Sequence, residues 1–343
     1  MSSAGKIIAV NPPNALPGAE IEVRVDGFSR DYSTVSGCFI DDVKCREIAA
    51  SRKRILAEVP TGLLAQNEAR VQLASGDDLS NSLPLRIART LAENMHIVAN
   101  PAVDPKDGSI VITRSGSRGQ QLPNTLYRLE VDGYLDELPV QVLNPTGLAF
   151  GPDNSLYVTN RAEGIVYRID RGEEAVPFAK GLGIATGLAF NSDGVMFVGD
   201  RSGTVYRILA DGTPDAFAKL DPSVAAYHIA FSPDGRLFVT APGLASFEGV
   251  VAIDADGGVE PYFRGLGRPQ GIAFDRDSNL YVAACYGGRR GIFRIAPGSE
   301  TAEHLVAGNG VVGLCFNRAG DMIVATNDTV YSLSLNIPGA LLN

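Results

Sequence analysis

The sequence predicts an all-β protein in which an N-terminal β-sandwich precedes a six-bladed β-propeller closed by an N-terminal strand. Two observations predict this fold. The first ninety residues consist of short runs in which apolar and polar residues alternate, and a unit of about 40 residues then recurs to the end of the chain. Alternation with a period of two is typical of strands with one buried face. We therefore expect two domains, 1–90 and 91–343.

The repeated unit reads as four strands. Its copies are "GLAFGPDNSLYVTN" from Gly147, "GLAFNSDGVMFVGD" from Gly187, "HIAFSPDGRLFVTA" from His228, "GIAFDRDSNLYVAA" from Gly271 and "GLCFNRAGDMIVAT" from Gly313. These copies begin 40, 41, 43 and 42 residues apart, and "NPAVDPKDGSIVIT" at 100–113 is a degenerate copy. A four-stranded unit of this length is typical of a propeller blade, so six copies predict six blades.

The two ends of the repeat region predict how the ring closes. The last copy stops after its third strand, "TVYSLSL", and "NMHIVAN" at 94–100 matches "AEHLVAG" at 302–308, the fourth strand of the preceding copy. We therefore expect residues 94–100 to supply the outer strand of the last blade, which removes an open edge. His96 and His304 would then occupy the same position of two outer strands, which favours a structural role over a metal site.

The first ninety residues resemble a known module. Six or seven short strands with glycine at the turns predict an antiparallel sandwich. The motifs "VNPPNALPGAEIEVRVDGF", "CFIDD", "AEVPTG", "ARVQLASG" and "NSLPLRI", in this order, resemble the immunoglobulin-like IPT/TIG domain. This resemblance implies a binding or spacer module without catalytic residues. A turn at Asp41 and Asp42 would set Cys38 opposite Cys45, either as reduced thiols, which we favour, or as a bridge.

Charge and hydropathy exclude two classes of partner. The net charge is -9, and all of it lies after residue 90, because the first ninety residues carry 11 basic and 11 acidic side chains. An acidic body repels phosphate backbones, so we expect no nucleic-acid binding. No apolar run reaches about 18 residues, so we expect no membrane span. The start of the chain has no apolar leader, which predicts a cytoplasmic protein, although a mature exported form would read the same.

One face of the predicted propeller carries the most variable loops. The loops between second and third strands are longest at 115–124, 242–249 and 285–291. Insertions on one face of a repeat array mark a binding face. Arginines there could bind a carboxylate or phosphate, unless they pair with neighbouring acids or are simply solvated. The candidates on this face are Arg114, Arg161, Arg201, Arg268, Tyr286, Arg289 and Arg290.

The residue before each repeated glycine is expected to face the central tunnel. These residues are Thr146, Thr186, Tyr227, Gln270 and Val312, with Ala99 or Asn100 in the degenerate copy. In one copy His228 replaces the repeated glycine, which adds a titratable group beside the tunnel. His228 is therefore the best single candidate for function, and a histidine that is merely packed is an equal alternative.

Residues 98–343 resemble two families of six-bladed propeller, the senescence-marker-protein/gluconolactonase-like family and the NHL-repeat family. The motifs that carry this resemblance are "NPTGLAFGPDNSLYVTN", "HIAFSPDGRLFVT" and "RPQGIAFDRDSNLYV". The lactonase resemblance implies a divalent cation, such as calcium, held by Glu and Asn/Asp side chains at the tunnel mouth, with an Asp as general base. The matching positions of this chain hold no carboxylate, whereas calcium takes several oxygen ligands that usually include carboxylates.

The absence of carboxylates at these positions decides which function we predict. We expect a non-catalytic binding or scaffold protein, without a cofactor, that recognises a protein partner or a small anionic ligand on the loop face. The alternative is a gluconolactonase-like hydrolase or lyase with a divergent site around His228. In that alternative Tyr227 and the arginines would stabilise an anion.

Overall fold

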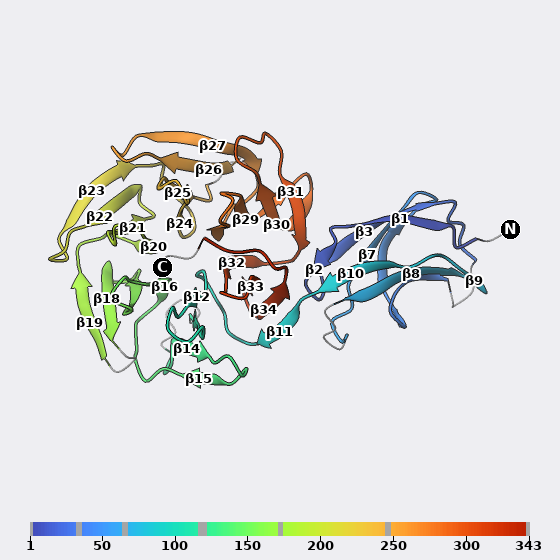
Figure 1. Ribbon diagram of the computed structural model, residues 1–343, viewed down its shortest axis with the longest axis horizontal. Helices are drawn as coiled ribbons and strands as arrows, with labels where there is room; N and C mark the ends of the chain where they lie inside the picture. Colours follow the sequence, from blue (N-terminus) through green and yellow to red (C-terminus); the bar gives the residue numbers. More distant parts are fainter. Residues whose placement is uncertain are drawn as a thin grey trace. The chain divides into compact units, whose positions relative to one another are not determined.

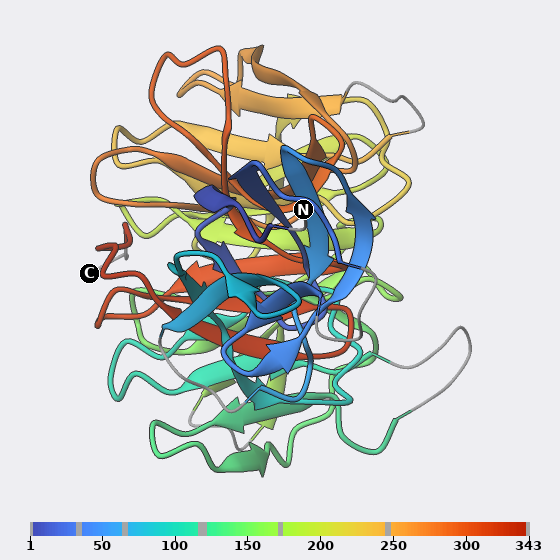
Figure 2. The same ribbon diagram turned by 90° about the vertical axis from the view of Figure 1, so that its right-hand side faces the viewer.

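The computed structural model describes residues 3–31, 36–63, 68–115, 122–170, 174–243 and 248–340. Every regular element among these residues is a β-strand (Figure 1, Figure 2), which confirms the predicted all-β class. Within the same ranges there is no helix of the length and apolarity needed to cross a membrane. The chain divides into two compact units, of which the first comprises 1–90, 289–293 and 303–309 and the second the remainder.

The N-terminal residues of the first unit form two sheets. One sheet has the order β1 (Lys6–Asn11), β3 (Glu20–Asp26), β7 (Arg54–Glu58), β6 (Arg46–Ala50). The other has the order β2 (Asn14–Ala15), β10 (Leu83–Ile87), β8 (Ala69–Ser75), β4 (Gly37–Ile40), β5 (Val43–Lys44), with β9 (Asp78–Leu79) paired to β8. Strand β1 contacts β8 and β10, so the sheets pack on each other. The predicted alternation is present in β3, where Val23 and Val25 are buried and Arg24 is exposed.

A tight hairpin joins β4 and β5. Phe39 pairs with Lys44 and Ile40 with Val43, and the Cys45 N–H donates to the Cys38 carbonyl at 2.8 Å. The two cysteines are therefore opposite each other, as the hairpin prediction requires, and both are buried free thiols. A hydrogen bond with Cys45, together with burial, raises the pKa of the Cys38 thiol.

The second unit is built from four-stranded antiparallel sheets arranged around a common centre (Figure 1). The first sheet along the chain consists of β12 (Ala102–Val103), β13 (Ile110–Thr113), β14 (Leu126–Leu129) and β15 (Leu135–Glu137). The second consists of β16 (Pro145–Phe150), β17 (Leu156–Asn160), β18 (Ile165–Asp170) and β19 (Glu174–Ala179). The third consists of β20 (Ala185–Phe190), β21 (Met196–Asp200), β22 (Thr204–Ile208) and β23 (Pro214–Lys219). The sheets continue with β24 (His228–Phe231), β25 (Leu237–Thr240), β26 (Glu248–Ile253) and β27 (Val259–Leu266), which are followed by β28 (Ile272–Phe274) and β29 (Leu280–Tyr286). Strand β31 (Glu303–Ala307) and residues 289–293 of β30 (Arg289–Ile295) belong to the first unit. In Figure 1 strands β16, β20 and β24 lie near the centre, and β19, β23 and β27 lie outside.

The last sheet takes its outer strand from an earlier segment than expected. Its order is β11 (Arg89–Ala92), β34 (Val330–Ser334), β33 (Asp321–Thr326), β32 (Val311–Phe316). Residues 94–100 form no strand, so the prediction that they close the ring was wrong, although an N-terminal strand does pair with β34. The reason is local, because Asn94 and His96 adopt left-handed conformations with φ of 62° and 49° that interrupt a strand. His96 therefore has no strand position equivalent to that of His304 in β31.

The repeated motif encodes a repeated contact between neighbouring sheets. The aromatic residue of each second strand meets the aromatic residue that ends the next sheet's first strand, in edge-to-face geometry. These pairs are Tyr157–Phe190, Phe197–Phe231, Phe238–Phe274 and Tyr281–Phe316, with ring centroids 5.2, 5.2, 4.8 and 5.1 Å apart. Such pairs add about 0.5–1.5 kcal/mol each beyond the area they bury. They hold the sheets in the spacing that brings the first strands together at the axis.

Candidate functional site

The repeated glycines themselves meet at the axis of the second unit. A Cβ atom added to Gly147 would lie 2.3 Å from the Thr186 carbonyl oxygen and 3.2 Å from the Gly187 Cα. A Cβ added to Gly187 would lie 3.3 Å from the His228 Cα, and one added to Gly271 would lie 2.5 Å from the Gly313 Cα. Neighbouring first strands thus approach closely enough that a side chain at these positions displaces backbone. Only His228 and Asn100 depart from glycine here.

Two of the residues before the glycines, Thr186 and Tyr227, are placed differently from the prediction, whereas Thr146 does line the axial cavity. Successive side chains of a strand point to opposite sides of the sheet, so a residue beside an axial glycine can point between neighbouring sheets. Tyr227 is accordingly 0% exposed, and its hydroxyl donates to the Asp221 carbonyl at 2.5 Å. The Thr186 hydroxyl donates to the Gly199 carbonyl at 3.0 Å. Neither side chain lines the cavity described next.

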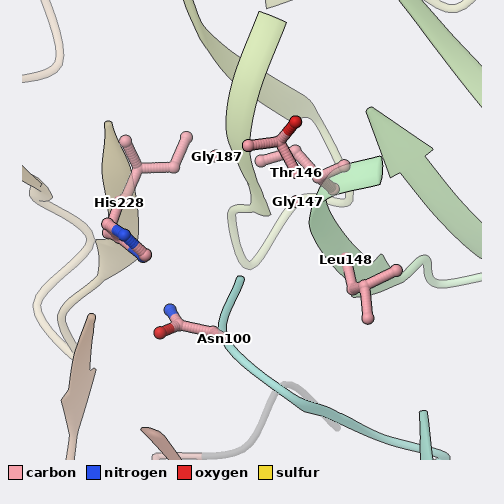
Figure 3. Close-up of a pocket in the computed structure, with 8 residues that line it drawn as sticks. Asn100, Thr146, Gly147, Leu148, Gly187 and His228 are labelled. Carbon is pink, nitrogen blue, oxygen red and sulfur yellow. The ribbon is translucent and has the colours of Figure 1, made fainter. Parts of the chain in front are cut away.

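A small polar cavity lies at the axis (Figure 3). The centre of a water-sized molecule can move within about 10 Å³ of it, and all of its empty space, open solvent included, is about 220 Å³. The cavity therefore has room for about one water molecule. The lining residues are Asn100, Thr146, Gly147, Leu148, Gly187, Leu188, His228 and Ile229. Of the residues predicted to face the tunnel, the structure thus brings Thr146, His228 and Asn100 together.

His228 is the titratable side chain of this cavity. It begins β24, where it pairs with Thr240 of β25, and it is only 4% exposed. Burial lowers the pKa of its imidazole from 6.5 to about 4, so the ring is neutral at pH 7. Among the residues that the structure describes, no group hydrogen-bonds either ring nitrogen. A neutral imidazole without a partner can accept a proton from a molecule in the cavity.

Asn100 supplies the second polar side chain, and its amide and the imidazole of His228 are directed toward the same space (Figure 3). The Asn100 Oδ1 accepts from the Leu314 N–H at 3.2 Å, and its Nδ2 donates weakly to the Ile272 carbonyl at 3.4 Å. The amide is thereby oriented by two neighbouring strands. The repeat pattern did not decide between Ala99 and Asn100 as the residue that faces the tunnel. Aligning "NPAV" with "GLAF" would have placed Asn100 at the glycine position.

The donor atoms of this cavity do not fit a divalent cation. The Thr146 hydroxyl donates to the Asn144 carbonyl at 3.0 Å, and the Thr186 and Tyr227 hydroxyls are used in the same way. The side chain of Gln270 is not among the lining residues. Within the described ranges no cluster of three or more His, Cys, Asp or Glu side chains could hold a metal ion. Calcium requires six to eight oxygen ligands, which these residues do not supply.

The candidate arginines do not form one continuous group. The Arg114 guanidinium donates to the Tyr127 hydroxyl at 3.2 Å, and Arg268 is exposed with φ of 48°. Arg161 and Arg201 are half-buried at the ends of neighbouring sheets. Parts of two predicted loops, 116–121 and 244–247, lie outside the described residues.

The remaining candidates belong to the β29–β30 hairpin. Arg289 lies in the first unit, where it forms ion pairs with Glu20 at 2.6 Å and Glu22 at 2.5 Å. This double pairing satisfies its charge. Arg290 is exposed, and the Tyr286 ring packs against Phe263 with centroids 5.8 Å apart. A ligand-binding role for these residues stays a prediction.

Comparisons with known proteins identify the fold. No family model matches the chain, and no curated protein matches it by sequence. Among solved structures, a gluconolactonase from Xanthomonas campestris is similar with a TM-score of 0.59 and 18% identity, covering 73% of this chain and 90% of that one. A streptogramin B lyase has a TM-score of 0.52 and 15% identity, covering 78% and 86%. A catalytically inactive histidine-to-alanine variant of virginiamycin B lyase from Staphylococcus aureus, with quinupristin, has a TM-score of 0.51 and 14% identity, covering 90% and 98%. These similarities show that the chain contains a β-propeller.

Proposed function

We propose that the protein is a hydrolase or lyase that opens cyclic esters, with His228 as the general base. One observation carries this proposal: a neutral imidazole without a hydrogen-bond partner faces a polar, water-sized cavity at the axis. A buried polar group with no partner costs free energy. A ligand that supplies a proton donor at this point would remove that cost.

Two reactions are consistent with one base at this position. In hydrolysis, His228 takes a proton from a water molecule in the cavity, the oxygen attacks the ester carbonyl, and the ring C–O bond breaks as the alkoxide regains the proton. In elimination, His228 takes a proton from the carbon beside the one that bears the ester oxygen. A double bond then forms and a carboxylate leaves. The Asn100 amide would orient the ester or the water.

The structural neighbours support this proposal over a purely binding protein. They include an enzyme described as a gluconolactonase and two described as lyases, and one of these lyases is catalytically inactive when a histidine is replaced by alanine. The water-sized cavity favours hydrolysis, and the inactive histidine variant favours elimination. The proposed reaction requires no cation, in keeping with donor atoms that do not fit one.

A lactone panel tests the proposal. Ring opening by purified protein should be lost in His228→Gly, which introduces the residue that the other copies carry and should preserve the fold. Added imidazole should partly restore turnover, because the substitution leaves space where the ring was. The mass of the product separates the two reactions, since hydrolysis adds one water molecule and elimination adds none. Full activity in His228→Gly would refute the role of the imidazole.

A second set of outcomes would favour a binding protein. If no cyclic ester is opened while a protein or small anion binds the loop face tightly, the non-catalytic function is the better explanation. Thermal unfolding of wild type and His228→Gly shows whether the variant is folded, so that a lost activity is attributed to the imidazole alone.

We also propose the finer features of the fold. The four-stranded sheets and the repeated aromatic pairs support a six-bladed propeller of the gluconolactonase-like and NHL type over residues 91–343. The two packed sheets support an immunoglobulin-like sandwich of the IPT/TIG type over residues 1–90. Recognition of a protein partner or an anion on the loop face and a cytoplasmic location also remain proposals.

A further inference from the structure

Two arginines occupy equivalent positions in neighbouring sheets of the second unit. Pro145 of β16 pairs with Asn160 of β17, so Arg161 is one residue beyond that pair. Ala185 of β20 pairs with Asp200 of β21, which places Arg201 in the same way. Strands β17 and β20 are in contact, so these two sheets are adjacent. Both arginines therefore lie on the face where β16 and β20 begin, as does the lining residue Thr146.

The carboxylates nearest in sequence to Arg161 and Arg201 are those of Glu163 and Asp200, and both accept hydrogen bonds from other groups. The Glu163 Oε2 accepts from the Asn160 amide at 2.6 Å and from the Tyr167 hydroxyl at 2.9 Å.

The Asp200 Oδ1 accepts from the Ile184 N–H at 2.9 Å and from Ser202. Within the described part of the chain, neither Arg161 nor Arg201 forms an ion pair. The one hydrogen bond that the Arg201 guanidinium donates to these residues is long, with the Val224 carbonyl oxygen at 3.5 Å.

Two half-buried guanidinium groups without acidic partners repel each other. Burial and the charge of Arg201 together lower the pKa of Arg161. This repulsion and the burial of the two guanidinium groups are unfavourable unless a negative group beside them compensates. Guanidinium groups bind carboxylate and phosphate oxygens in bidentate fashion, and a bound oxyanion would offset both burial and repulsion.

We propose that Arg161 and Arg201 form a binding site for the oxyanion of a small molecule on the face where β16 and β20 begin, the same end of β16 that carries the cavity-lining Thr146. The ligand chemistry is a carboxylate or phosphate group, held between two guanidinium groups from neighbouring sheets. This assignment narrows the arginine candidates to one pair. It rests on the proposed function only in one respect, namely that the anion would belong to the ester that His228 opens.

Binding of inorganic phosphate and of acetate tests the site directly. Each is titrated into the full-length protein by calorimetry at constant ionic strength, with chloride as the control anion. Arg161→Gln and Arg201→Gln should each weaken binding roughly tenfold or more, as expected for the loss of charge-assisted hydrogen bonds. Arg207→Gln is the matched control, because Arg207 is paired with Asp215 at 2.5 Å. Binding of acetate but not phosphate would assign a carboxylate, and binding of both would assign either oxyanion.

Thermal unfolding without added anion provides a second measurement. Each single Arg→Gln substitution should leave the midpoint unchanged or raise it, because it removes repulsion. A lowered midpoint in both variants would assign the pair a structural role and overturn the proposal. Anion binding that is unchanged in both variants, or equal for chloride and phosphate, would also overturn it.

The failure of this inference is distinguishable from failure of the proposed function. His228→Gln should abolish turnover while retaining phosphate binding. If no ester is opened but phosphate binding depends on the arginine pair, the anion site stands without the reaction. If esters are opened equally well with and without a carboxylate substituent, and phosphate does not bind, the reaction stands without the anion site.

Discussion

Acid should destabilise this protein through His228 in a defined pH window. The folded chain lowers the pKa of the imidazole from 6.5 to about 4 by burial, so the unfolded chain binds more protons between these values. The free energy of unfolding therefore falls as the pH falls from 6.5 toward 4. One pKa unit corresponds to about 1.4 kcal/mol, so the whole window is worth about 3 kcal/mol. At pH 5 the loss is about 2 kcal/mol.

The variant His228→Gln isolates this contribution because glutamine does not titrate. The midpoint of thermal unfolding is measured for wild type and variant at pH 7.5 and pH 5. Between pH 7.5 and pH 5 the midpoint of wild type should fall by roughly 4–8 °C more than that of the variant. The reason is that about 1 kcal/mol shifts the midpoint of a domain of this size by about 2–4 °C. His96→Gln replaces an exposed histidine and should behave as wild type.

Carboxyl groups do not interfere with this comparison. Burial opposes ionisation of Asp153, but hydrogen bonds from Ser155 outweigh it and lower its pKa from 3.8, so its contribution is lost only below pH 4. The contribution of Asp153 is also the same in wild type and in His228→Gln. Equal loss of stability in wild type and His228→Gln between pH 7.5 and 5 would refute the reasoning that the fold holds the imidazole neutral.

Two further predictions concern the packing that creates the site. Gly147→Ala places a Cβ atom 2.3 Å from the Thr186 carbonyl oxygen and should destabilise by about 1–3 kcal/mol in urea unfolding, whereas Gly62→Ala, with no atom within 4 Å, should be close to wild type. Unfolding of both variants at the same concentration of urea would contradict the close approach at the axis. Tyr281→Phe removes the hydroxyl that donates to the Asp275 carboxylate at 2.8 Å and should lower the free energy of unfolding by about 1–2 kcal/mol. An unchanged midpoint of unfolding would show that this buried hydrogen bond makes no net contribution to the free energy of unfolding.

The candidate site could be predicted only in part. The repeat alignment identified His228 as the copy that departs from glycine, and that residue does lie at the axis. The same alignment placed Tyr227 at the tunnel, yet its hydroxyl donates to the Asp221 carbonyl between sheets. The alignment also left Asn100 undecided. In both cases the alternation of side chains along the strand was predicted correctly. Which of two neighbouring side chains faces the axis depends on the packing of the adjacent sheets.

The sequence by itself determined the all-β class, the repeat and the opposed cysteines, because these depend on local alternation, period and turn residues. Only the tertiary structure decided that residues 89–92 rather than 94–100 pair with β34, and that the glycine positions meet at the axis. It also decided that Arg161 and Arg201 have no acidic partner among the described residues. The physical reason is common to these cases. Strand pairing, close backbone approach and ion pairing all depend on atoms supplied by distant segments, and no spacing along one chain specifies which of those atoms come into contact.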